Sequence, residues 1–68
     1  MLCPRCGQGQ VQKVIIIKTR EPVHLCEECD ALWQNGIVVS GVGFVDFATY
    51  VIDFGLKGQW TEVYIIDE

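Results

Sequence analysis

Runs of β-branched residues separated by turn residues occupy the first part of the chain. Residues 10–20 are rich in valine, isoleucine and threonine, which predicts a strand. Glu21-Pro22 predicts the turn that follows, because proline fixes one backbone dihedral. Residues 23–25 then begin a predicted return strand, which residues 31–34 continue.

Residues 44–54 carry apolar side chains at the three- and four-residue spacing of a helix. Asp46 is placed to cap the start of this helix, and Gly55 follows it as a helix-ending glycine would. Phenylalanine, tyrosine, valine and isoleucine are mediocre helix formers, so a strand is the alternative. We predict a short helix held by packing; its spacing is set by Phe44, Phe47, Tyr50, Val51 and Phe54.

Strands are predicted on both sides of this helix. Asn35-Gly36 is a turn signal, and residues 37–40 after it are a strand candidate. Residues 56–58 are predicted as a loop, and residues 60–66 as a final strand. One face of that strand would carry Trp60, Glu62, Tyr64 and Ile66.

The chain has 68 residues, half of them hydrophobic, which allows one domain. A chain this short buries little apolar surface and usually needs a metal, disulfides or a partner. Its early apolar run at residues 14–17 is far shorter than the ~20 residues that span a bilayer. Polar and cysteine residues at positions 3–6 interrupt any secretory signal. We therefore expect no membrane association and a cytoplasmic location, where thiols stay reduced.

Two C-x-x-C pairs are the strongest chemical signal. Nineteen residues separate the pair Cys3 and Cys6 from the pair Cys26 and Cys29, within the range typical of zinc sites. Each pair can close a tight loop, or knuckle, that presents two thiolates. An intervening hairpin would bring four sulfurs together, an arrangement that suits a structural Zn²⁺ ion. His24 is a substitute ligand candidate, although four thiolates already complete the coordination.

The residue that follows each pair often needs a left-handed backbone, which Gly7 adopts without strain and Asp30 tolerates. The segments 3–7 and 25–30 resemble the zinc-ribbon class. The resemblance implies two knuckles at the ends of an antiparallel hairpin. The predicted fold is therefore α+β, a small antiparallel zinc-ribbon sheet with one short helix. Residues 1–35 would form the metal-binding ribbon and residues 36–68 an acidic, apolar extension.

Four cysteines could also form disulfides, act as redox dithiols or bind iron. Disulfides need an oxidising compartment, for which the chain carries no signal. A thioredoxin-type dithiol needs a strand-helix context that neither pair has. Iron is the stronger rival, because Cys3–Gly7 also resembles a rubredoxin knuckle, which would make the protein an electron carrier. Asp30 departs from the rubredoxin pattern, which has glycine there.

The charge is uneven along the chain. The formal net charge is −4, and all of it comes from residues 31–68, where Lys57 is the only cation. Four thiolates and one divalent ion would lower the total to about −6. Such a charge opposes approach to phosphate and argues against nucleic acid as a partner. The rival hypothesis remains a nucleic-acid-binding or transcription-associated ribbon that uses Lys13, Lys18 and Arg20.

The residue types favour binding over catalysis. The one histidine adjoins the cysteines and no nucleophile has a base beside it, so we expect no enzyme. A domain this small cannot bury all of its apolar residues, and exposed ones often mark interfaces. Acidic residues interleave with them, which suits a basic protein partner; self-association is the alternative. The predicted partner-binding residues are Asp46, Tyr50, Asp53, Trp60, Glu62 and Tyr64.

A second resemblance concerns most of the chain. The run 25–33, the aromatic residues of segment 47–54, Gly55-Leu56 and segment 60–62 resemble small bacterial zinc-ribbon immunity proteins of contact-dependent inhibition and other polymorphic toxin systems. The resemblance implies an acidic immunity protein, or toxin inhibitor, that blocks a basic nuclease by covering its substrate surface.

Overall fold

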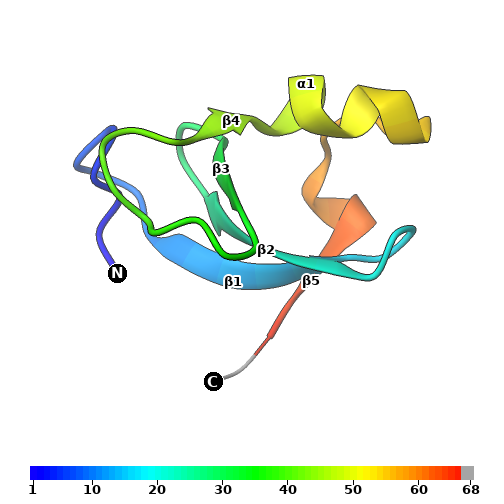
Figure 1. The fold of residues 1–68 in the computed structure, drawn as a ribbon, viewed down its shortest axis with the longest axis horizontal. Coiled ribbons are helices and arrows are strands. Elements are labelled where there is room, and N and C mark those ends of the chain that lie inside the picture. Colours follow the sequence, from blue (N-terminus) through cyan, green and yellow to red (C-terminus); the bar gives the residue numbers. More distant parts are fainter. Residues whose placement is uncertain (67–68) are drawn as a thin grey trace.

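The computed structural model describes residues 1–66 and shows a five-stranded antiparallel sheet with one short α-helix above it (Figure 1). The α+β class predicted from the sequence is confirmed. The sheet order is β4-β3-β2-β1-β5. The strands are β1 (Val11–Ile16), β2 (Glu21–Cys26), β3 (Ala31–Gln34), β4 (Val45–Asp46) and β5 (Val63–Ile65). The helical elements are α1 (Phe47–Val51) and two 3₁₀ turns, η1 (Ile52–Phe54) and η2 (Trp60–Glu62).

The first turn lies earlier than predicted. Residues 17–20 form it, and Arg20 takes a left-handed φ of 62°. Pro22, predicted in the turn, is instead the second residue of β2 and pairs with Ile15. β2 pairs with β3 only from Val23 onward. No residue of β3 therefore lies opposite Pro22, and β3 does not need the N–H that proline lacks.

Two predicted strands are also corrected. Residues 37–40 form no strand, and the chain runs through a loop from Asn35 to the start of β4. The predicted strand at 60–66 begins only at Val63, because residues 60–62 form η2. The Glu62 carboxylate accepts backbone N–H bonds from Gly58 and Gln59, both at 2.8 Å, which curls this segment away from strand geometry.

The short helix and its Asp46 cap are confirmed, but α1 covers less than the predicted segment 44–54: Phe44 precedes it in the loop, residues 45–46 form β4, and residues 52–54 form η1. The Asp46 side chain accepts the N–H of Thr49 at 3.1 Å, as an N-terminal cap does. Gly55 takes a φ of 79° and ends the helical segment through η1. Phe47 and Val51 point into the protein and are buried, so the helix is held by packing. No helix within residues 1–66 has the length and apolar character to cross a membrane.

Buried apolar residues fall into two clusters. The helix cluster lies between the sheet and α1 and contains Val14, Ile16, Val23, Leu25, Leu32, Phe47, Val51 and Val63. The knuckle cluster contains Cys3, Val11, Cys26, Ala31 and Trp33, with Cys6, Cys29, Val39 and Phe44 packed against it. Adjacent residues of β3 belong to different clusters because successive side chains in a strand point to opposite faces.

Candidate metal centre

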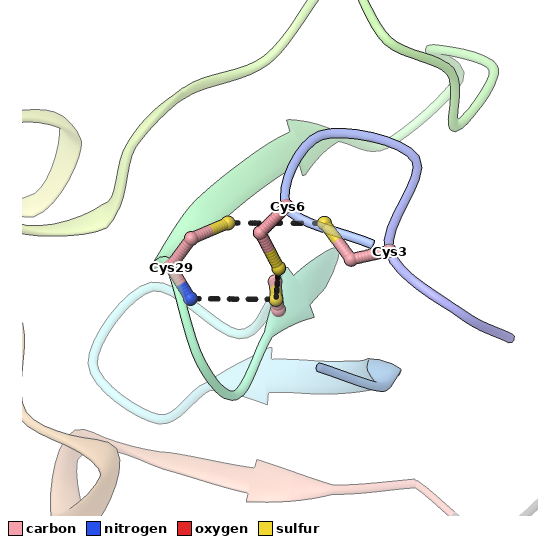
Figure 2. A group of neighbouring side chains, drawn as sticks. Cys3, Cys6 and Cys29 are labelled. Atoms are coloured by element: carbon pink, nitrogen blue, oxygen red, sulfur yellow. Dashed lines mark hydrogen bonds between the residues drawn. The ribbon is translucent and has the colours of Figure 1, made fainter. Parts of the chain in front are cut away.

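The four cysteine side chains converge at one end of the sheet. Their Sγ atoms all lie within 4.8 Å of one another. The shortest approaches join the two knuckles, with Cys3 Sγ and Cys29 Sγ 3.7 Å apart and Cys6 Sγ and Cys26 Sγ also 3.7 Å apart. Figure 2 shows the thiols of Cys3, Cys6 and Cys29 turned toward one another. A tetrahedron with metal–sulfur bonds of ~2.3 Å has edges of ~3.8 Å, so the group fits one ion.

The two knuckles are built by different means. The first is a short N-terminal loop in which Cys3 N–H donates to Gly9 O at 2.8 Å and Gly7 N–H donates to Cys3 O at 2.9 Å. The second is the connection between β2 and β3, with Cys26 as the last residue of β2. The sheet therefore orients the second knuckle directly, whereas the first folds back onto it.

Left-handed residues follow both pairs, as predicted. Gly7 has a φ of 70° and Asp30 a φ of 61°. Each lets the chain reverse immediately after the second cysteine of its pair. The carbonyl of Asp30 then accepts the N–H of Phe47 at 2.9 Å, which links the second knuckle to the start of α1.

Backbone N–H groups surround the sulfur atoms in a repeated pattern. Arg5 N–H donates to Cys3 Sγ at 3.4 Å, and Glu28 N–H donates to Cys26 Sγ at 3.4 Å. The donor lies two residues after the first cysteine in both knuckles. Donors aimed at sulfur stabilise the thiolate, which is the form that binds a metal.

The thiols differ in acidity. Backbone N–H donors from Gly9 and Gln8 lower the pKa of Cys6 to about 6. Burial raises the pKa of Cys26 to about 12, and burial also raises the pKa of Cys29. Burial opposes ionisation of Cys3 as well, but N–H donors from Cys6 and Arg5 leave its pKa below the ordinary value. A positive ion among the four sulfurs would offset the cost of holding buried thiolates together.

Gly9 is a site residue that the sequence reading missed. It is buried, and a Cβ built on it would lie 2.7 Å from Glu28 Cβ and 2.9 Å from Cys26 Sγ. The first knuckle can therefore approach the second closely only because residue 9 has no side chain. Nothing in the local pattern distinguishes Gly9 from Gly7, since the close approach involves residues nearly twenty positions away.

The predicted partner-binding residues do not gather on one face. Asp46 and Asp53 are exposed on the helical layer. Tyr50 and Trp60 are half-buried against the helix cluster, and Glu62 binds backbone N–H groups. Tyr64 pairs with Ile15 in the sheet and alternates with the buried Val63, so it points away from α1.

Two of these residues have polar roles inside the fold. The Tyr50 hydroxyl donates to both carboxylate oxygens of Glu21, at 2.7 and 2.8 Å. Burial, followed by this bond to a carboxylate, raises the pKa of Tyr50 to about 12. Backbone N–H donors from Lys57 and Gln59 lower the pKa of Glu62. Among the predicted nucleic-acid contacts, Lys18 Nζ donates to the carbonyl of Phe54.

Comparison with protein-family models, with curated proteins and with solved structures gives no match for this chain. Its classification rests on its own residues. A small antiparallel sheet whose two C-x-x-C knuckles bring four thiols together fits a zinc ribbon. The residues that could hold the ion are Cys3, Cys6, Cys26 and Cys29.

Proposed function

We propose that the protein is a non-catalytic, cytoplasmic interaction module stabilised by a structural zinc ion. The convergence of the four Sγ atoms within 4.8 Å supports this proposal most directly. The ion cross-links the two knuckles, and zinc binding in small domains contributes roughly 10–16 kcal/mol of apparent free energy. Four cysteine ligands leave no open coordination position for substrate, which is typical of structural rather than catalytic zinc.

Metal analysis of the purified protein tests the first part of this proposal. We expect one zinc ion per chain and a colourless solution. Iron fits four thiolates as well, and it would give a coloured protein and support a rubredoxin-like electron carrier. A protein that binds neither ion with all four thiols reduced would contradict the proposed metal centre.

The proposed partner is a basic protein, and the specific role is inhibition of a toxin nuclease. Several large apolar side chains are exposed, among them Val38, Val42 and Ile52. Asp53 is exposed next to Ile52 in the sequence, and Asp46 is exposed at the start of α1. An apolar centre with acidic neighbours favours a basic surface and speeds association through electrostatic steering.

Capture followed by inhibition tests the proposed role. The tag belongs at the C-terminus, because the Met1 amino group donates to Gln10 Oε1 at 3.1 Å close to the first knuckle. We expect a stoichiometric basic protein at moderate salt, whose nuclease activity is lost on adding one equivalent of this protein. Captured nucleic acid that is released as salt rises would instead favour the nucleic-acid-binding alternative.

The acidic part of the surface can be tested without disturbing the fold. Asp46→Asn with Asp53→Asn removes two charges, and asparagine caps a helix as well as aspartate does. The control pair is Glu27→Gln with Glu28→Gln, which removes two charges from the second knuckle. We expect the first pair to slow association several-fold at low salt and the control pair to have a smaller effect. Equal effects would assign the rate to net charge alone.

A further inference from the structure

The loop between β3 and β4 packs on the metal centre and not on the helix cluster. Residues 36–44 contribute Val39 and Phe44 to the knuckle cluster and nothing to the helix cluster. The N-terminal ten residues behave in the same way, since their buried apolar side chain, that of Cys3, belongs to the knuckle cluster. Both segments therefore pack in the knuckle cluster, which includes the four cysteines.

Trp33 holds this loop in place from β3. Its indole Nε1–H lies 3.1 Å from the carbonyl oxygen of Ser40 and 3.2 Å from that of Val42. Its ring meets the Phe44 ring edge-on, with centroids 5.9 Å apart and planes inclined at 65°. Trp33 is fully buried, so these contacts are made out of water.

Arg5 joins the loop to both knuckles. It lies between Cys3 and Cys6 in the sequence, and its guanidinium carbon stands 4.7 Å from the centroid of the Phe44 ring. Its Nη1 donates to the carbonyl oxygen of Cys29 at 3.4 Å. A continuous path of contacts therefore runs from the first knuckle through Arg5 and Phe44 to Trp33 and the loop.

We propose that metal binding orders residues 36–44 through this path, while the helix cluster stays folded without metal. The inference rests on the proposed metal binding. Residues 1–10 belong to no helix and no multi-residue strand, and apart from the sulfur contacts and the Arg5–Cys29 bond the hydrogen bonds between them and the second knuckle join Gln10 to Glu27. The ion would therefore be a main connection between the two knuckles. Loss of the first knuckle removes Arg5 from Phe44 and opens the knuckle cluster around Trp33. The helix cluster draws its residues only from positions 14–63 outside the loop and keeps its packing.

The consequence concerns three exposed apolar side chains, two of which have the largest exposed fractions among the large apolar residues within residues 1–66. Val38 is 80% exposed, Val42 73% and Ile37 45%, and all three lie on this loop. A defined surface made of these residues exists only while the loop is ordered. Metal occupancy would then decide whether that surface is presented.

Hydrogen exchange on the full chain tests the proposal, with zinc-loaded protein compared with protein stripped by EDTA. We expect exchange of residues 1–10 and 36–44 to rise at least about ten-fold on stripping, with the β1, β2 and α1 amides still protected. In Trp60→Phe, where Trp33 is the only tryptophan, stripping should shift the tryptophan emission to longer wavelength. Loss of protection throughout the chain, or unchanged exchange in 36–44, would overturn the proposal.

Variants at Arg5 test the path itself. Arg5→Ala should leave zinc stoichiometry intact and speed exchange in residues 36–44 about two- to five-fold, as expected for loss of a cation–π contact. Lys57→Ala, which also removes one cation, should leave that exchange unchanged. Unaltered exchange of residues 36–44 in Arg5→Ala would reject the proposed path of contacts through Arg5. A protein that binds no zinc would reject the proposed function, whereas a zinc-binding protein with an indifferent loop would reject only this inference.

Discussion

At the scale of single residues, Gly9 sets the distance between the two knuckles. A methyl group there would overlap Glu28 and the sulfur of Cys26. We predict that Gly9→Ala introduces about 1–3 kcal/mol of strain and weakens zinc binding about ten-fold. Gly41→Ala is the matched control, because its Cβ would meet only Pro4 O at 3.8 Å. Competition with a chromogenic chelator measures both affinities, and equal affinities would show that the knuckles can separate at little cost.

Glu62 gives a pH-dependent prediction at the same scale. Its folded pKa lies below the ordinary value of 4.5, because the carboxylate accepts backbone N–H bonds. A lowered folded pKa stabilises the fold above pH 4.5, and the stabilisation is lost as pH falls through the folded pKa. Glu62→Gln should therefore be less stable than the parent at pH 7, with the gap narrowing below pH 4.5. Denaturant unfolding across this range checks it, and a gap independent of pH would contradict the assignment.

At the scale of elements, the Asp46 cap supports α1, most of whose residues have low intrinsic helix propensity. Asp46 accepts both the backbone N–H and the side-chain hydroxyl of Thr49, each at 3.1 Å. We predict that Asp46→Ala costs about 1 kcal/mol of unfolding free energy, while Asp46→Asn costs almost nothing. Thermal denaturation of the two variants decides this. Equal losses would show that charge, not the hydrogen bond, is what Asp46 supplies.

The same scale shows what the sequence could and could not predict. The α+β class, the capped helix and the left-handed residues after each cysteine pair followed from local signals, because caps and positive φ angles depend on neighbouring residues. The turn predicted at Glu21-Pro22 was wrong. Proline favours turns, but a strand also tolerates it where no partner strand requires its N–H. The apolar segment 37–40 read as a strand, yet Trp33 binds it as a loop through side-chain contacts that the sequence does not reveal.

The predicted strand at 60–66 was wrong at its start for a related reason. Alternation along residues 60–66 placed Glu62 and Tyr64 on one face, but η2 occupies 60–62 and breaks the period. The metal-binding cluster of four cysteines could be predicted because the spacing of the two C-x-x-C pairs is visible in the sequence. The neighbours that support them, Gly9 and Phe44, come from packing between distant segments.

At the scale of the whole molecule, the two clusters should respond separately to damage. Val51 is buried in the helix cluster, whereas the cysteines belong to the knuckle cluster. We predict that Val51→Ala lowers the free energy of unfolding by about 2 kcal/mol and leaves zinc affinity unchanged. Denaturant unfolding and chelator competition on one preparation measure both quantities. Release of zinc by this substitution would mean that the clusters form a single cooperative unit.

The order of the elements along the chain also bears on how the protein is made. All four cysteines lie within the first 29 residues, whereas the helix cluster closes only when Val63 in β5 pairs with Ile16 in β1. Synthesis proceeds from the N-terminus, so all four cysteines are in the chain before the residues of β5 are added. With the proposed ion absent, the protein would carry four reduced thiols in an unclosed knuckle cluster, where they are open to oxidation.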